Sequence, residues 1–220
     1  MRQVVRIRPA GRGGARRAVW LDDGRRLVLD ADDVSRLGLE PGQGVDDLLL
    51  GRLDRLAQEA EARAAALRLL NVRLRSRAEL EHRLRRRGFD PTTVARVLDR
   101  LAAAGWVDDR RFARAWVEGR LALGRAGPRR LRAELRARGV PPELVDEALR
   151  AAWQPEEERS RAEALARRHL ARTRALPPEV RLRRVAGLLA RSGFSPEVVA
   201  DLLRRLAREV APTVTGREVP

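Results

Sequence analysis

The sequence predicts a mainly α-helical protein of three tandem three-helix repeats, preceded by a small N-terminal β-hairpin and a long connecting helix. A segment of about 25 residues occurs three times, centred on Gly88, Gly139 and Gly193, and self-similarity at a period near 50 is typical of stacked supersecondary units. Hydrophobic residues make up 44% of the chain and aromatic residues only 3%. The core must therefore consist of Leu, Ala and Val, of which Ala and Leu favour helix.

The three copies align in five columns of matching residues. The apolar columns are spaced three and four residues apart, which predicts one buried face on each helix. The shared glycine suits the left-handed turn that ends a helix, and the shared proline suits the first turn of the next. The columns are Leu80/Leu131/Val185, Leu84/Leu135/Leu189, Pro91/Pro142/Pro196, Val94/Val145/Val199 and Leu98/Leu149/Leu203.

The first thirty residues have the pattern of β-structure. RQVVRIRP, ARRAVWL and RRLVLD are short β-branched or alternating runs, and Asp23-Gly24 favours a tight hairpin turn. We expect two or three strands, with Trp20 on the strand before the turn and GRGG at 11–14 as a flexible connection. Because an isolated hairpin is marginally stable, it should pack on a helix.

From about Val45 onward, the spacing of the apolar residues predicts a helix of nearly thirty residues. This helix should bridge the hairpin to the first repeat. Ser76 and Glu79 form a capping box at the next helix start, and Asp90-Pro91 starts a third helix. Glycine and proline positions then divide the chain. The predicted parts are 1–45, the hairpin extension; 46–107, the long helix and first repeat; 108–154, the second repeat; 155–210, the third repeat; and 211–220, a flexible tail.

The net charge of +16 is unevenly distributed, and all 47 basic residues are arginine. Residues 71–138 carry 19 arginines against eight acidic residues, an excess of +11, whereas 1–70 and 139–220 have excesses of only +2 and +3. A genomic preference for arginine explains the lack of lysine, but it does not explain why basic residues outnumber acidic ones so strongly in residues 71–138. The basic region is either a surface for a polyanion or acidic partner or a solvated helix face.

Arginines on the outer faces of two helices are the candidate partner-binding or DNA-binding residues. If Leu80, Leu84, Leu131 and Leu135 face inward, the arginines between them face out, and guanidinium groups bind phosphate or carboxylate oxygens in bidentate fashion. Because these faces have almost no stacking aromatics, we expect sequence-independent contacts. The candidates are Arg73, Arg75, Arg83, Arg86, Arg87, Arg110, Arg111, Arg129, Arg130, Arg132 and Arg136.

The sequence offers few residues for catalysis. It has no cysteine, and neither His82 nor His169 has a second His or Cys at metal-binding spacing. Asp108-Asp109 suits helix capping better than acid–base chemistry. We therefore expect no catalytic residue, no metal and no cofactor. No run of apolar residues is long enough to span a membrane, so a cytoplasmic protein is expected.

Tryptophans are expected to act in packing rather than binding. Trp106 and Trp153 follow the third helices of the first two repeats, and Trp116 lies on the apolar face of the second repeat's first helix. All three should pack between repeats, and Trp20 should pack the hairpin.

Three motifs resemble the RecX family, the regulatory partners of the RecA recombinase. They are SRAELEHRLRRRGFD, LAAAGWVDDRRFARAWVEGR and GPRRLRAELRARGV, and the resemblance covers roughly residues 60–209. The VWLDDGRRLVLD run is also similar to the N-terminal extension of many members. The most specific motif runs from Trp106 to Gly127, with Trp116 where the family commonly has Tyr.

This resemblance implies a non-enzymatic, monomeric modulator of RecA, with its repeats in an elongated curved array. Such proteins bind RecA filaments on single-stranded DNA along the filament groove and act in recombination, repair and the SOS response. Most often they limit strand exchange, ATP hydrolysis and co-protease activity. Inhibition, capping, disassembly and support of the filament all remain open. The alternative is a sequence-independent nucleic-acid-binding repeat protein that acts without RecA.

Overall fold

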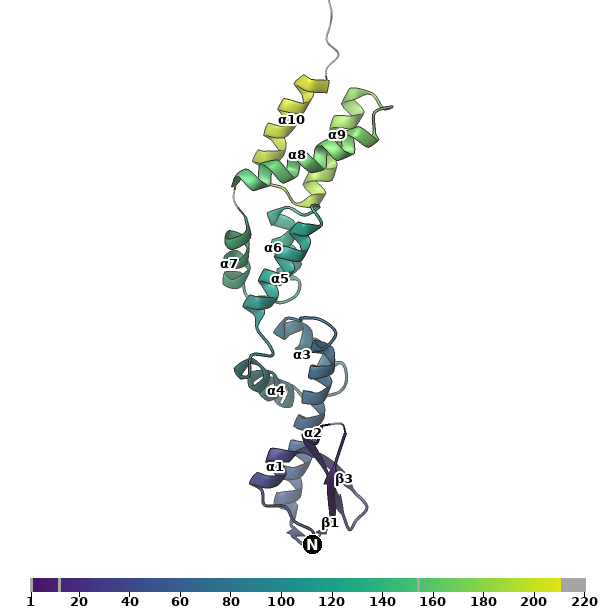
Figure 1. Ribbon diagram of the computed structural model, residues 1–220, viewed down its shortest axis with the longest axis vertical. Helices are drawn as coiled ribbons and strands as arrows, with labels where there is room; N and C mark the ends of the chain where they lie inside the picture. The colour runs from purple at the N-terminus through teal and green to yellow at the C-terminus, as the bar shows by residue number, and fades with distance from the viewer. Residues whose placement is uncertain (1, 12, 154, 211–220) are drawn as a thin grey trace, which may run out of the picture. The chain divides into compact units, whose positions relative to one another are not determined.

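The computed structural model of the protein describes residues 2–11, 13–153 and 155–210 (Figure 1). In these ranges the chain forms four strands and ten helices, which confirms the mainly helical prediction. It divides into two compact units, Met1–Asp108 and Asp109–Pro220, which are described separately below. None of the described helices combines the length and apolar content that a membrane span needs.

The first unit begins with an antiparallel sheet in the order β3-β2-β1-β4. The predicted hairpin is present, with Trp20 on the strand before the turn and Gly24 in the turn at φ 86°. The fourth strand was not predicted, because two residues are too few to show an alternating pattern. The strands are β1 Arg2–Pro9, β2 Arg16–Leu21, β3 Arg26–Asp30 and β4 Gly44–Val45.

The sheet packs on α2, the predicted connecting helix. This helix has 24 residues rather than nearly thirty, because it begins after Asp46 and already ends at Leu70. The Asp46 carboxylate accepts a hydrogen bond from the backbone N–H of Leu49 at 2.7 Å. Its N-terminal half buries Leu50 and Leu53 against the sheet, and its C-terminal half belongs to the first three-helix repeat. The helices of this unit are α1 Ala31–Arg36, α2 Asp47–Leu70, α3 Arg77–Arg85 and α4 Pro91–Ala103.

Side-chain caps start both later helices of the first repeat, as predicted. The Ser76 hydroxyl accepts from the backbone N–H of Glu79 at 3.1 Å. The Asp90 carboxylate accepts from the N–H groups of Thr92 and Thr93, both at 2.9 Å. These bonds satisfy amides that have no partner inside the helix.

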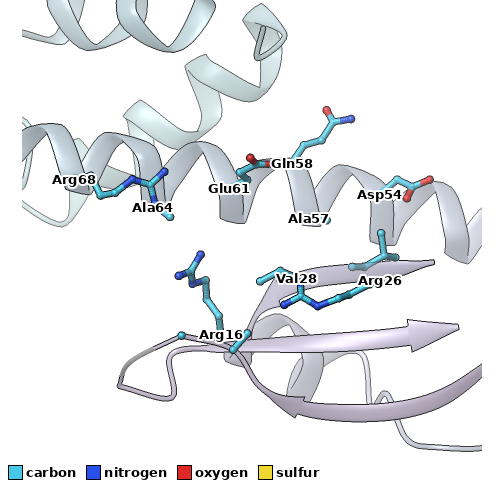
Figure 2. A pocket seen from close by; sticks show the side chains of 12 residues that line it. Arg16, Arg26, Val28, Asp54, Ala57, Gln58, Glu61, Ala64 and Arg68 are labelled. Atoms are coloured by element: carbon cyan, nitrogen blue, oxygen red, sulfur yellow. The ribbon is translucent and has the colours of Figure 1, made fainter. Parts of the chain in front are cut away.

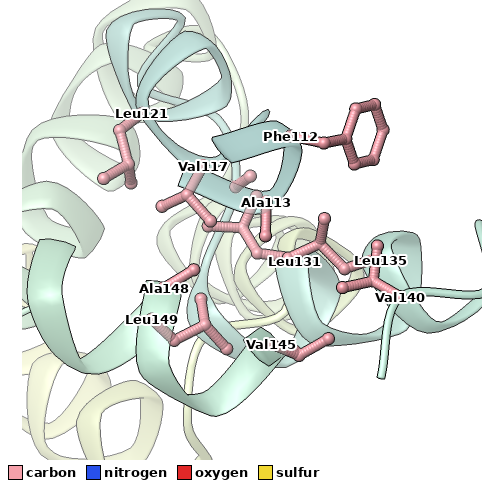
Figure 3. Packing of buried hydrophobic residues seen from close by; sticks show 11 residues of the cluster. Phe112, Ala113, Val117, Leu121, Leu131, Leu135, Val140, Val145, Ala148 and Leu149 are labelled. Carbon is pink, nitrogen blue, oxygen red and sulfur yellow. The ribbon is translucent and has the colours of Figure 1, made fainter. Parts of the chain in front are cut away.

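The second unit contains two three-helix repeats. The core of the first of them is formed by the apolar faces of its three helices (Figure 3). The other three helices enclose a core of their own. The helices are α5 Asp109–Ala122, α6 Pro128–Arg136, α7 Pro142–Ala152, α8 Pro155–Arg172, α9 Pro178–Ser192 and α10 Pro196–Val210.

The repeat alignment agrees with the backbone and the core. The three central glycines have φ of 89°, 70° and 80°, and the Leu80 and Leu84 columns are fully buried in all three repeats. On α10, however, Val199 and Leu203 are only partly buried, whereas Leu202 and Leu206 are in the core. Leu202 and Leu206 align with Val97 and Leu101 of α4, which are also buried. α10 therefore keeps the buried face of the repeat, but Val199 and Leu203 lie nearer the edge of that face.

The predicted packing of tryptophans between repeats holds for one residue of three. Trp153 contacts the cores of both repeats in the second unit. Trp116 packs only on the core of its own repeat, and Trp106 is 53% exposed. Trp20 lies between Arg6 and Arg26 on the neighbouring strands, with guanidinium carbons 4.2 and 5.5 Å from ring centroids.

Candidate partner-binding surface

Three arginines at the end of α3 form the first arginine patch. Leu80 and Leu84 are fully buried, and helical periodicity leaves Arg83, Arg86 and Arg87 exposed on the outer side. Within the described part of the chain, none of these three side chains forms a salt bridge or hydrogen bond. Their guanidinium donors are therefore available to an external anion.

Two candidates just before α3 contribute to its structure. Arg73 donates to both carboxylate oxygens of Glu79, at 3.1 and 3.2 Å. Arg75 is only 8% exposed, and its Nε donates to the carbonyl oxygen of Leu69 at 3.2 Å. Burial and the nearby charges of Arg73 and Arg83 lower the pKa of the Arg75 guanidinium. Arg75 thus holds the α2–α3 connection and offers almost no surface to a partner.

The second arginine patch lies on α6 in the other unit and consists of Arg129 and Arg136. Both residues are exposed because Leu131 and Leu135 turn the opposite face of the helix into the core. Their side chains form no salt bridge or hydrogen bond with any described residue. As on α3, the buried leucines place these arginines on the outer face of the helix, where their guanidinium donors are available to an external anion.

The remaining α6 candidates are held by carboxylates. Arg130 Nε donates to Glu134 at 3.0 Å. Arg132 donates to Asp146 on α7 through two nitrogens at 2.9 and 3.1 Å, and it is only partly exposed. The expectation that the arginines of this helix face outward is therefore incomplete, since Arg132 connects two helices.

The candidates at the start of α5 are exposed as expected. Arg110 Nε lies 3.1 Å from the carboxylate of Glu147 on α7, which Arg114 also contacts at 2.7 Å. Arg111 is exposed and has interactions of its own. Arg110 therefore connects α5 to α7 as well as adding surface charge.

The cluster around Glu134 was not anticipated from the sequence. The Glu134 carboxylate accepts hydrogen bonds from Trp116 Nε1 at 3.0 Å and from Arg120 at 2.6 Å. The Arg138 guanidinium stacks on Trp116, 3.7 Å from the ring centroid. Burial opposes ionisation of Glu134, but the hydrogen bonds from Arg130, Arg120 and Trp116 outweigh it and hold its pKa below the usual value. The i,i+4 spacing signals the Arg130 pair, but nothing local signals a contact 18 residues away.

A cavity of about 670 Å³ lies between the sheet and α2 in the first unit. Figure 2 shows Arg16, Arg26 and Arg68 around it, together with Asp54 and Glu61. Because both signs of charge line this cavity, it favours neither anions nor cations. It is therefore a weaker candidate than the arginine patches.

The described residues contain no group of three or more His, Cys, Asp or Glu side chains that could hold a metal ion. His82 is exposed and His169 is partly buried.

Comparison with known families identifies two of the repeats. Residues 62–101 match RecX, first three-helix domain, and residues 108–149 match RecX, second three-helix domain. The first match spans the C-terminal half of α2 through α4, and the second spans α5 through α7. Both arginine patches lie inside these matched regions.

Curated relatives cover most of the chain. A regulatory protein RecX from Thermobifida fusca is 47% identical over 150 residues, which are 68% of this chain and 78% of that protein. Another, from Mycobacterium avium, is 42% identical over 155 residues, 70% of this chain and 89% of that protein.

Solved structures show the same fold. A crystal structure of a regulatory protein RecX aligns with a TM-score of 0.76 at 23% identity, over 92% of this chain and 98% of that one. The RecX of Lactobacillus salivarius aligns with a TM-score of 0.61 at 19% identity, over 68% of this chain and 96% of that one. By its sequence relatives, and in agreement with its fold, this chain belongs to the RecX family of regulatory proteins.

Proposed function

We propose that this chain is a negative regulator of the RecA recombinase. It binds RecA filaments on single-stranded DNA along the filament groove and limits strand exchange, ATP hydrolysis and co-protease activity. It acts as a monomer in the cytoplasm and performs no chemical step of its own. Membership of the RecX family supports the regulatory role, and the surface chemistry supports an anionic partner.

The observation that carries the proposal is the set of arginines without internal partners. Arg83, Arg86 and Arg87 in one unit and Arg129 and Arg136 in the other are exposed and unpaired among the described residues. By contrast, Arg73, Arg130 and Arg132 are held by carboxylates of this chain. An arginine that already has a partner gains less from an external anion, so within the basic region 71–138 binding should depend on these five unpaired arginines.

RecA-dependent ATP hydrolysis on single-stranded DNA tests this function. Adding the chain in stoichiometric amounts should lower the hydrolysis rate, and the R83E/R87E/R129E/R136E variant should lower it much less. If the chain leaves hydrolysis unchanged while binding the filament, inhibition is wrong. If it neither binds nor inhibits, regulation of RecA is wrong.

A second candidate function is sequence-independent binding of nucleic acid without RecA. The same unpaired guanidinium groups favour it, because they match phosphate oxygens. It predicts binding to naked single-stranded DNA that weakens steeply as salt rises, since each neutralised phosphate releases counterions. Tight, salt-sensitive DNA binding with no effect on RecA would favour this function over the first.

A further inference from the structure

A groove of about 640 Å³ lies inside the second unit, between the α5–α6 connection and the helices α8 and α9. This volume is within the range of roughly 300–1,000 Å³ that is usual for ligand pockets. Only one of its lining residues, Arg130, is among the candidates named from the sequence. The groove is therefore a separate feature from the two arginine patches.

The charge of the groove has a single sign. Arg125, Arg130, Arg168 and Arg172 line it, and none of the described residues around it is Asp or Glu. Within the described ranges Arg125 and Arg172 have no hydrogen bond or salt bridge through their side chains. Because Arg130 already pairs with Glu134, the guanidinium groups of Arg125, Arg168 and Arg172 supply most of the positive potential of this concave surface, which favours an anionic ligand.

The groove also has apolar lining residues, which the binding of a phosphate group alone would not need. Leu123 is 62% exposed at its edge, and Leu165 and Leu188 line it. Among the described residues that line the groove, His169 is the one aromatic ring and there is no Phe, Trp or Tyr, so the groove offers little on which a base could stack. Aliphatic contacts next to guanidinium groups fit a peptide with both carboxylate and aliphatic side chains.

The walls of the groove are fixed before any ligand binds. The backbone N–H groups of Gly127 and Arg129 donate to the carbonyls of Ser192 and Gly193 at 2.7 and 3.0 Å. In addition, Arg168 donates to the carbonyl oxygen of Gly124 at 3.1 Å. A groove with a preformed backbone loses less conformational entropy on binding, which favours affinity.

We propose that this groove binds an acidic peptide segment of a partner protein, with at least one leucine-like side chain among its carboxylates. The carboxylates pair with Arg125 and Arg172, and the aliphatic side chain packs on Leu123 and Leu188. The proposal goes beyond regulation of RecA and does not depend on it, since any partner with such a segment satisfies this chemistry.

Fluorescence anisotropy with the full chain and a labelled synthetic peptide of Asp, Glu and Leu tests the proposal. The peptide should bind, and R125E/R172E should weaken binding by roughly tenfold or more, because two charge-assisted pairs are lost. The matched control is R174E/R183E, which makes the same charge change at two exposed third-repeat arginines without described partners. This control should bind close to the parent.

Leucine replacements in the groove and in the peptide test the apolar part of the proposal. Leu123→Ser, or replacement of the peptide's Leu by Ser, should weaken binding severalfold, and far-UV circular dichroism should show all variants folded. Three results would overturn the proposal: no peptide binding, equal loss in R125E/R172E and R174E/R183E, or no effect of either Leu replacement. Binding of labelled oligothymidylate, but not peptide, through Arg125 and Arg172 would assign the groove to nucleic acid instead.

Discussion

The backbone N–H of Gly127, just before α6, donates a hydrogen bond of 2.7 Å to the carbonyl of Ser192 at the end of α9. The second and third repeats therefore meet backbone to backbone. A Cβ atom on Gly127 would lie 2.5 Å from the carbonyl carbon and oxygen of Gly193. No side chain can be accommodated at this position without moving one repeat away from the other.

Gly127→Ala should consequently destabilise the second unit by about 1–3 kcal/mol, the usual effect of overpacking a close contact. Gly127 has an ordinary φ of −90°, so backbone strain does not contribute. Gly119→Ala is the control, because a Cβ there meets no atom within 4 Å, and alanine inside a helix is favoured by about 0.5–1 kcal/mol. Urea unfolding measures both changes, and a G127A protein as stable as the parent would contradict this contact.

Leu84→Ala and Leu135→Ala should each destabilise the protein by about 2–5 kcal/mol, because both side chains are fully buried in repeat cores. Leu135 is shown in its cluster in Figure 3. Leu48, which is 82% exposed, provides the control, since Leu48→Ala should change stability by less than about 0.5 kcal/mol. Thermal unfolding distinguishes them; equal melting temperatures for all three variants would refute the repeat register.

The lowered pKa of Glu134 predicts a pH-dependent contribution to stability. A carboxyl whose pKa is lower in the folded than in the unfolded state stabilises the fold above its unfolded pKa, for which 4.5 is the reference value. That contribution is lost as the pH falls through the folded pKa. Glu134→Gln should therefore lower the melting temperature at pH 7, and the difference from the parent should shrink in acid. A difference that is constant with pH would contradict ionic stabilisation by Arg120 and Arg130.

Much of the fold could be predicted because it depends on local signals. Ser76 and Asp90 cap their helices as expected, since a cap involves residues only two or three positions apart. The glycine-centred turns follow from backbone sterics. Strand β4 and the partial burial of Val199 and Leu203 on α10 were missed because distant packing decides them.

The candidate surface was predictable only in part, for a related reason. Helical periodicity places Arg83 and Arg136 outside, and both are exposed. Periodicity does not reveal that Arg132 meets Asp146 across two helices, or that Arg75 is buried against Leu69. Internal ion pairs form between residues that the tertiary fold brings together. The structure is therefore needed to tell which exposed arginines already have a carboxylate partner and which do not.

The measurement that tests the central claim most directly is binding to RecA-coated single-stranded DNA, followed by light scattering or pull-down. The variant is R83E/R87E/R129E/R136E, which reverses four unpaired patch arginines and should leave helical content unchanged. The matched control is R159E/R174E/R183E/R184E, with the same charge change at four exposed arginines that have no described partner.

The account predicts that the patch variant loses filament binding while the control binds as the parent does. If the patch variant binds RecA filaments as tightly as the parent, the two patches are merely solvated helix faces and the account is wrong.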